Sequence, residues 1–425
     1  QGTSSMNSTE QHLQIQDYPP PAMRRLRVLS RHAASERIPE HQSLCPFGTS
    51  VKQLPSTMRA VVWRGEADPS AMKVETLKMP TPKEGEVLVK VRACGICHTD
   101  LHVMLGEVPF PKPAVMGHEI SGIVVGLGPG FEDSSLLGAK VMSPFIMPCG
   151  KCRFCELGEE DTCEPFFALN RLKGQLYDGS TRLQTVAGEE VAMYSMGGLA
   201  EYCVVPRTAV FRLPEKLGIT MFAESSILGC MFFTAYGAVH NAAKLKPGES
   251  VAVIGCGGVG SAVLQLAKSM GCSPIIAVDI GEEKLQQAKA NGATHGVDAT
   301  SDVPQAIADV TSGRKVDVCF EAIGLKKTFE NAVMSVRDGG RAAYIGISDV
   351  KTKAEVPITH MVRRRITLAG SYGARASTDV PPLLKLVEEG HIDISSPISR
   401  RFKLADAAQG YALLKSREIL GRAIV

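Results

Sequence analysis

The sequence feature that most restricts the fold is a glycine-rich segment at residues 255–260. It reads Gly-Cys-Gly-Gly-Val-Gly, follows the apolar run 251–254, and precedes a helical pattern that extends to about residue 270. A strand, a tight glycine turn and a helix in this order form the phosphate-binding start of a dinucleotide-binding βαβ unit, in which the helix N-terminus faces the pyrophosphate. The positions predicted to face the cofactor are Gly255, Gly257, Gly258, Val259 and Gly260.

An acidic residue, Asp279, follows Gly260 by nineteen residues, at the end of the next apolar strand, 275–279. A carboxylate in this position accepts hydrogen bonds from the adenosine ribose and repels a 2′-phosphate. The sequence therefore predicts NAD rather than NADP as the cofactor. Lys284, one helical turn further on, is either a neighbour of the same ribose or a solvated residue on a helix face.

Strands and helices alternate through the segment that contains this loop. Further strands are predicted at 316–321 and 341–347, and a helix at 282–291. Such alternation requires right-handed crossovers and gives a doubly wound parallel sheet of the α/β class. We assign residues 230–370 to this Rossmann NAD-binding domain.

The preceding segment has short strand patterns at 59–63, 86–92, 120–125 and 200–205, separated by Pro and Gly, so we assign residues 58–229 to a mostly-β domain. A chain of 425 residues is long enough for two or three domains. Its formal net charge of +3 is spread along the chain, which does not favour a nucleic-acid partner. The longest apolar stretch has 14 residues and is shorter than a membrane span.

The first 57 residues show no sustained strand or helix periodicity and contain three consecutive prolines, so we predict a disordered extension. From Met23 this segment is Arg-rich and at first free of acids, which is typical of an organelle transit peptide. Glu36 and Glu40 favour the alternative, an ordinary basic tail. A transit peptide would imply a mitochondrial or plastid location, and an ordinary tail a cytoplasmic one.

Four of the twelve cysteines are clustered in one short segment: Cys149, Cys152, Cys155 and Cys163. Such close spacing lets a loop wrap around one tetrahedral Zn²⁺. Because sulfur would fill all four positions, the ion would be structural. The alternatives are unpaired or disulfide-bonded cysteines, but three cysteines at i, i+3 and i+6 cannot all pair with one another.

A second set of candidate ligands and proton-transfer groups is spread over three segments. Its members are Cys97, His98, Thr99, His102, His118, Glu119 and Cys230. Three protein ligands would leave the fourth tetrahedral position for water or substrate, as a catalytic zinc requires. Residue type alone leaves open that Cys230 is a small buried apolar residue and His118 a core histidine.

The stretch Gly-Ile-Cys-His-Thr-Asp-Leu-His at 95–102, Gly-His-Glu at 117–119, the cysteine quartet and the glycine-rich loop occur in this order. In that order they resemble the motifs of the zinc-containing medium-chain alcohol dehydrogenases, from about residue 58 to residue 425. The resemblance implies a GroES-like catalytic domain, residues 58–229 completed by 371–425, interrupted by the Rossmann domain. It also implies two zinc ions and NAD per chain, and a homodimer.

The resemblance assigns roles to individual residues. The catalytic zinc would be bound by Cys97, His118 and Cys230, with Asp100 and Glu119 behind the ligands, and the structural zinc by the cysteine quartet. Thr99 and His102 match the proton relay. The positions that match cofactor contacts are His98 and Arg422 at the pyrophosphate and Thr234, Ile323 and Ile347 at the nicotinamide.

These roles imply an NAD-dependent oxidoreductase that interconverts a small-molecule alcohol and aldehyde. Apolar side chains near the expected pocket favour a primary or hydrophobic substrate; they are Phe145, Phe166, Phe167 and Met231. Glutathione-dependent formaldehyde dehydrogenases of this family have an acid where Val108 stands and an arginine near Phe167. Neither matches here, which argues against that activity.

Two alternatives remain. A polyol or amino-alcohol dehydrogenase of the same architecture would complete the zinc ligands with Glu119 rather than Cys230, although Cys230 in its sequence context favours the first interpretation. A non-catalytic NAD-binding or scaffold protein would be expected to have a broken ligand set or relay, and both are complete in this sequence.

Overall fold

The computed structural model describes residues 54–132 and 134–425. All but the last four residues of the predicted extension, and with them the transit-peptide prediction, lie outside the described residues. The first strand, β1, begins at Thr57, one residue before the predicted start of the mostly-β domain.

One sheet consists entirely of parallel strands in the order β13-β12-β11-β14-β15-β16. The strands are β11 (Val251–Ile254), β12 (Ile275–Asp279), β13 (His295–Asp298), β14 (Val316–Glu321), β15 (Val336–Tyr344) and β16 (Thr367–Gly370). This is the doubly wound order, in which the chain reverses direction next to the first strand. The predicted α/β class is confirmed.

Helices cover both faces of this sheet, and alternate residues of β11 therefore belong to two different apolar clusters. Val251 and Val253 belong to the larger cluster, whereas Ala252 and Ile254 join a second cluster with Val303 of the following helices. The helices are α5 (Gly258–Ser269), α6 (Glu282–Ala290), α7 (Val303–Val310) and α8 (Lys326–Ser335). Strand burial on both faces explains why these strands read as unbroken apolar runs.

The last predicted strand of this sheet differs from the observed one. We predicted residues 341–347, but β15 ends at Tyr344 and begins five residues earlier, at Val336. The pairing with β14 shifts register at Val316/Val318, and Gly339 has φ +74°. This irregularity hides the start of the strand, because the first half lacks the apolar run on which the prediction depended.

The mostly-β part contains two further sheets. The first has the order β2-β1-β4-β8-β7, with β1 (Thr57–Trp63), β2 (Lys73–Lys78), β4 (Ala114–Val115), β7 (Leu183–Gln184) and β8 (Glu190–Met193). The second is built around β3 and contains β3 (Glu86–Ile96), β5 (Ile120–Leu127), β6 (Lys140–Ser143), β9 (Tyr202–Pro206) and β10 (Phe211–Arg212). Short helices connect them, namely α1 (His98–Met104), α2 (Arg153–Glu156) and α3 (Glu215–Thr220).

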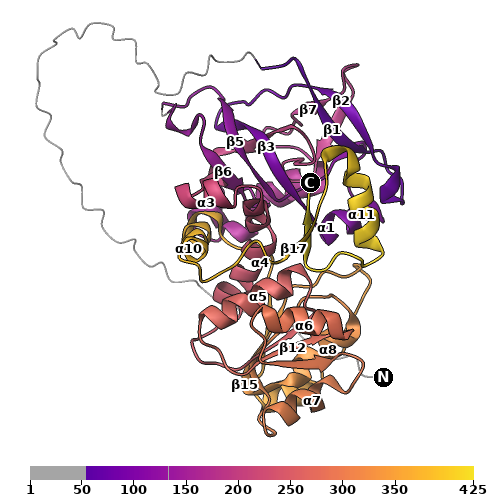
Figure 1. Cartoon of the computed structure of the whole chain (residues 1–425), viewed down its shortest axis with the longest axis vertical. Coiled ribbons are helices and arrows are strands. Elements are labelled where there is room, and N and C mark those ends of the chain that lie inside the picture. Colours follow the sequence, from indigo (N-terminus) through magenta and orange to yellow (C-terminus); the bar gives the residue numbers. More distant parts are fainter. Residues whose placement is uncertain (1–53, 133) are drawn as a thin grey trace, which may run out of the picture. The chain divides into compact units, whose positions relative to one another are not determined.

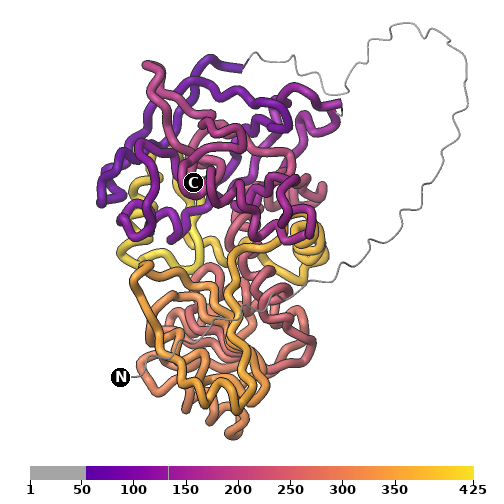
Figure 2. Tube along the Cα trace, turned by 180° about the vertical axis from the view of Figure 1, so that it is seen from behind, coloured from indigo at the N-terminus to yellow at the C-terminus, as the bar shows by residue number. Residues whose placement is uncertain are grey.

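The C-terminal segment returns to the sheet around β3. Strand β18 (Arg422–Ile424) pairs antiparallel with β3 and parallel with β17 (Ile398–Arg401). In both views the yellow C-terminal segment runs beside the indigo β3, and helix α11 (Ala407–Lys415) contacts α1 (Figures 1 and 2). The remaining helices are α4 (Met231–Gly237), α9 (Ile358–Arg363) and α10 (Ala376–Glu388).

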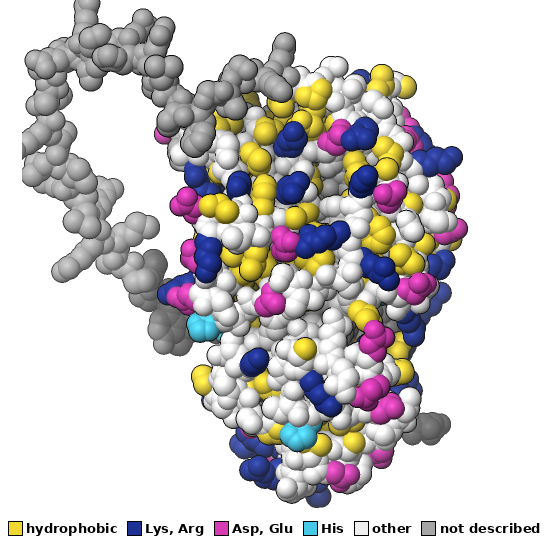
Figure 3. Space-filling model, viewed as in Figure 1, with side chains coloured by type: hydrophobic (Ala, Val, Ile, Leu, Met, Phe, Trp, Pro, Cys, Tyr) yellow, Lys and Arg dark blue, Asp and Glu magenta, His cyan; other side chains and the backbone are white. Residues whose placement is uncertain are grey.

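Within the described residues, no helix is both long and apolar enough to cross a membrane. Across most of the face drawn in Figure 3, acidic and basic side chains are interspersed. This distribution agrees with the small net charge of the sequence.

Candidate functional site

The structure brings four potential metal ligands together inside the protein. Ligand atoms of Cys97, His118, Glu119 and Cys230 all lie within 4.8 Å of one another, and all four residues are buried. The Sγ atoms of Cys97 and Cys230 are 4.0 Å apart. Two sulfurs bound to one tetrahedral Zn²⁺ at about 2.3 Å would be separated by roughly 3.8 Å, so this spacing suits a shared ion.

Each ligand lies at the end of a regular element. Cys97 follows the last residue of β3 and begins α1, and Cys230 ends the 3₁₀ helix Glu224–Gly229 and begins α4. His118 lies between β4 and β5, after Gly117, which has φ +92°. Only glycine adopts such a φ readily, so the turn that aims His118 inward requires Gly117.

His118 is oriented by a chain of two buried hydrogen bonds. Its Nδ1 lies 2.8 Å from Asp100 Oδ1, and the Tyr411 hydroxyl donates to Asp100 Oδ2 at 2.6 Å. Burial raises the pKa of Tyr411, and the Asp100 charge raises it further, so the hydroxyl remains a donor. A carboxylate on Nδ1 fixes the proton there and leaves the lone pair of Nε2 free for a metal.

Unpartnered polar atoms support a metal at this cluster. His118 Nε2 is buried and has no hydrogen-bond partner among the described residues. A buried polar atom without a partner is costly, and two thiols with one imidazole nitrogen are the donors that Zn²⁺ prefers. The residues therefore fit a zinc ion with three protein ligands, and Glu119 is close enough to be a fourth.

The Glu119 carboxylate lies between Gly95 and the guanidinium of Arg422. A Cβ on Gly95 would lie 2.3 Å from Glu119 Cδ, so glycine is needed there to admit the carboxylate. Arg422 Nε lies 3.5 Å from Glu119 Oε1, and both side chains are buried. Burial raises the pKa of Glu119 to about 7, although the charge of Arg422 opposes the shift.

Arg422 links this cluster to the glycine-rich loop. A Cβ on Gly258 would lie 3.2 Å from Arg422 Cζ, and the buried Arg422 Nη2 has no hydrogen-bond partner in the described part of the chain. The guanidinium thus adjoins the N-terminus of α5, where unpaired N–H groups favour an anion. This geometry fits the pyrophosphate contact expected for Arg422. His98, expected at the same group, is exposed at the start of α1.

The backbone of the glycine-rich loop, residues 255–260, can be approached closely by a ligand. Gly255 has φ +94°, and a Cβ on Gly260 would lie 1.8 Å from the Gly255 carbonyl oxygen, so both positions require glycine. No atom of the described residues lies within 4 Å of a Cβ built on Gly257, which leaves that surface open to a ligand. Gly258 and Val259 form the first turn of α5.

Asp279 ends β12 and is already bonded to the loop. Its Oδ2 accepts from the Cys256 backbone N–H at 2.7 Å, and its Oδ1 accepts from Ile280 N–H at 2.7 Å and lies 3.3 Å from Lys284 Nζ. The carboxylate therefore positions the glycine-rich loop in addition to the role predicted for it. Lys284 forms an ion pair with Asp279. This contact favours the first of its two interpretations, a position beside the ribose.

The residues expected at the nicotinamide come from separate elements. Thr234 is buried in α4, and Ile323 and Ile347 follow the carboxyl ends of β14 and β15. Ile323 packs against Gly255, and the Ile347 carbonyl adjoins Gly324. The two isoleucines thus lie on the loop edge of the parallel sheet, where ligands of such sheets bind.

The predicted relay residues lie on one side of α1. The Thr99 hydroxyl is 3.5 Å from Cys97 Sγ, and His102 follows one turn later with its Nδ1 bonded to Glu107. Glu107 was missed from the sequence, because an acid five residues after a histidine has no recognisable motif. Its carboxylate contacts the His102 imidazole at the outer end of the predicted relay and so helps to orient that ring.

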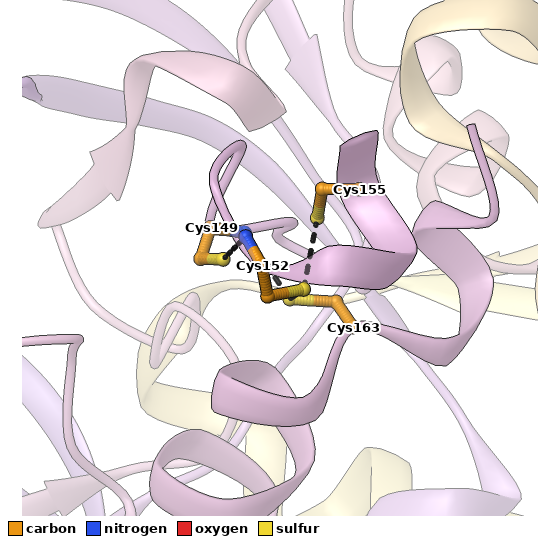
Figure 4. Close-up of side chains that lie close together, drawn as sticks. All are labelled: Cys149, Cys152, Cys155 and Cys163. Atoms are coloured by element: carbon orange, nitrogen blue, oxygen red, sulfur yellow. Dashed lines mark hydrogen bonds between the residues drawn. The ribbon is translucent and has the colours of Figure 1, made fainter. Parts of the chain in front are cut away.

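The cysteine quartet forms a second cluster whose four ligand atoms converge (Figure 4). Cys152 Sγ is 3.6 Å from Cys155 Sγ and 3.9 Å from Cys163 Sγ, too far for a disulfide and close to the edge of a zinc tetrahedron. Burial raises the pKa of the Cys163 thiol, and the Cys149 backbone N–H, which donates to Cys163 Sγ, opposes that rise. Burial alone would raise the pKa of Cys152, but hydrogen bonds, led by one from the Cys155 backbone, lower it to about 7.

Aromatic side chains surround His118. Phe145 and Tyr194 contact its ring edge-on at centroid distances of 5.9 and 5.6 Å, and Tyr372 lies 5.4 Å from Phe145 and 5.6 Å from Phe167. Phe145 and Phe167 thus belong to one aromatic wall. Phe166 and Met231 are completely buried in the core.

Two family models match the chain: the alcohol dehydrogenase GroES-like domain over residues 83–215 and the zinc-binding dehydrogenase over residues 258–389. An S-(hydroxymethyl)glutathione dehydrogenase of Synechocystis sp. is 31% identical over 81% of this chain and 93% of its own length. Alcohol dehydrogenase B of Mycobacterium tuberculosis is 30% identical over 86% and 97%. The crystal structure of benzyl alcohol dehydrogenase from Acinetobacter calcoaceticus aligns with TM-score 0.79 and 29% identity, covering 87% of this chain and 98% of that one.

Proposed function

The chain belongs to the zinc-dependent alcohol dehydrogenase family, and from this premise we propose that it oxidises a primary, hydrophobic alcohol to the aldehyde with NAD⁺ and catalyses the reverse reduction with NADH. The observation that supports this most is the buried set of Cys97, His118 and Cys230 with the free Nε2 of His118. Arg422 connects this set to the N-terminus of α5.

Cys97, His118 and Cys230 would hold a zinc ion, which would supply a Lewis acid that lowers the pKa of a substrate hydroxyl. The Thr99 hydroxyl, next to Cys97, is positioned to accept the proton, and His102 with Glu107 passes it toward solvent. NAD⁺, when bound, would accept a hydride from the carbon that bears this hydroxyl, so that the overall reaction would convert the alcohol and NAD⁺ into the aldehyde, NADH and one proton. Asp100, itself bonded by Tyr411, keeps the ligand His118 in a single tautomer and orientation.

The wall formed by Phe145, Phe167 and Tyr372 supports a hydrophobic substrate. We propose that benzyl alcohol and 1-hexanol are oxidised with higher kcat/KM than ethanol or sorbitol, measured as NADH formed. Preference for sorbitol would instead support the polyol dehydrogenase alternative. If protein that contains both zinc ions oxidised none of these alcohols with NAD⁺, the result would support a non-catalytic NAD-binding protein.

Asp279→Ala is expected to reduce the preference for NAD over NADP by about tenfold or more, since it removes the charge that opposes a 2′-phosphate. Turnover with NAD should also fall, because the Cys256 N–H loses its acceptor. The measurement is the ratio of kcat/KM for the two cofactors. Glu283→Ala, which removes an exposed acid of α6 and gives the same change in net charge, is the control; wild-type protein that already prefers NADP would contradict the assignment.

Tyr411→Phe is expected to weaken zinc binding at the Cys97 cluster by roughly 10- to 100-fold, the usual cost of losing a group that orients a metal-bound histidine. The substitution leaves Asp100 Oδ2 buried without its donor. Competition with a chromophoric chelator measures the affinity. Tyr344→Phe, which removes a tyrosine hydrogen bond in the parallel sheet, is the control; equal zinc retention in both variants would exclude a positioning role for Tyr411.

The homodimer, and an organelle location directed by the N-terminal extension, remain proposals from the sequence. Light scattering and the localisation of the full-length chain test them.

A further inference from the structure

We infer that Arg171 and Tyr194 form an anion-binding subsite in the substrate pocket, and that the preferred substrate has a carboxylate distal to its alcohol or aldehyde carbon. This inference depends on the proposed function, and it names the substrate class of the same site.

Arg171 carries a guanidinium that forms no ion pair with a carboxylate of the described residues. It is the last residue of the π-helical turn Phe166–Arg171, four residues after Phe167, and its Cζ lies 4.1 Å from the centroid of the Tyr194 ring. Its Nη1 is buried and has no hydrogen-bond partner within the described part of the chain. Asp100 is the carboxylate among its main electrostatic neighbours, and that group is already bonded to His118 and Tyr411.

Tyr194 adds a second donor without an acceptor. Its side chain is completely buried, and its hydroxyl has no partner among the described residues. Stacking on an aromatic ring offsets only part of the cost of a buried cation, and among the described residues neither Arg171 Nη1 nor the Tyr194 hydroxyl has an acceptor. Two unsatisfied donors side by side favour an anionic ligand.

The same tyrosine connects Arg171 to the reacting centre. The Tyr194 ring contacts Arg171 at 4.1 Å and the zinc-ligand candidate His118 at 5.6 Å. Tyr372 of the aromatic wall is a further neighbour of both Arg171 and Tyr194. A group bound at Arg171 would therefore be about one ring beyond the ligand cluster, and the side chains between are aromatic.

A carboxylate suits this subsite best. The planar guanidinium binds a carboxylate through two parallel hydrogen bonds, and the tyrosine hydroxyl can supply a third donor. The substrate would then consist of a primary alcohol or aldehyde, an aromatic or short alkyl spacer, and a carboxylate.

The test compares 4-(hydroxymethyl)benzoate with its uncharged methyl ester as substrates of the zinc-loaded enzyme with saturating NAD⁺. Wild-type kcat/KM should be about tenfold or more higher for the carboxylate, and Arg171→Gln should lower it by roughly 10- to 100-fold, mainly through KM, with the ester changed less than about threefold. Tyr194→Phe should weaken the carboxylate alone, by several-fold. Lys173→Gln, an exposed neighbour with the same change in net charge, is the matched control and should alter neither substrate.

An equal loss for both substrates in Arg171→Gln would show a purely structural arginine, and equal wild-type kcat/KM for the two would show that no carboxylate is recognised; either result overturns the inference. If Arg171→Gln does not fold, Tyr194→Phe and Arg171→Lys decide by the same ratio. If wild type oxidises neither compound, the proposed function fails separately. Calorimetric binding of 4-(hydroxymethyl)benzoate to the NAD⁺ complex then tests the subsite: binding lost in Arg171→Gln supports it, and no binding overturns it.

Discussion

Cys97→Ser is expected to abolish alcohol oxidation while the protein stays folded. The variant should contain one zinc ion per chain instead of two, and kcat/KM should fall by about 1,000-fold or more, since a Lewis acid contributes several kcal/mol to the transition state. The reason is local: Cys97 Sγ is 4.0 Å from Cys230 Sγ, and a hydroxyl is a poor substitute for one of two thiolates. Elemental analysis together with NAD-linked turnover measures both effects.

Cys203→Ser is the matched control for this experiment. Cys203 is as deeply buried as the ligands, in β9, but belongs to neither metal cluster. It should retain both zinc ions and nearly full activity. Retained activity in Cys97→Ser, with one zinc ion fewer than wild type, would show that the chemistry does not occur at this cluster.

Cys163→Ser is expected to have its largest effect on stability. Cys163 is the buried member of the quartet, and its Sγ accepts the Cys149 N–H. A structural zinc contributes to folding directly, so losing it should cost about 4 kcal/mol or more and lower Tm by about 5 °C or more in a chain of this size. Differential scanning calorimetry and zinc content of the purified variant check this.

Cys152→Ser, at a half-buried position of the same quartet, provides a second variant if Cys163→Ser does not accumulate. In both variants the zinc at the Cys97 cluster should remain, and per-molecule activity at low temperature should persist in the folded fraction. A wild-type Tm together with a full zinc complement would mean that the quartet does not bind zinc.

The parts of the site that depend on short sequence spacing were predictable. The quartet spans only residues 149–163, and the glycine-rich loop is defined by six consecutive residues between a strand and a helix. Their spacing alone indicates what they can bind, because the backbone between the groups is too short to take many paths. The doubly wound sheet follows in the same way from apolar runs that alternate with helices.

The parts that depend on long-range packing were not predictable from spacing. Tyr411 reaches Asp100 across 311 residues, and Arg422 reaches Glu119 only because β18 adds to β3. Nothing near either residue in the sequence indicates a partner; the family resemblance supplied Arg422 but not Tyr411. Arg171 and Tyr194 likewise meet only after folding, and each is an ordinary residue in its own segment.

The most direct test of the account is the zinc content of active wild-type protein, measured per chain alongside NADH formation from benzyl alcohol. The predicted result is two zinc ions per chain, with activity falling in proportion to the amount of the more easily chelated ion that is removed. Full activity with a single zinc ion, retained by the four cysteines, would contradict the account.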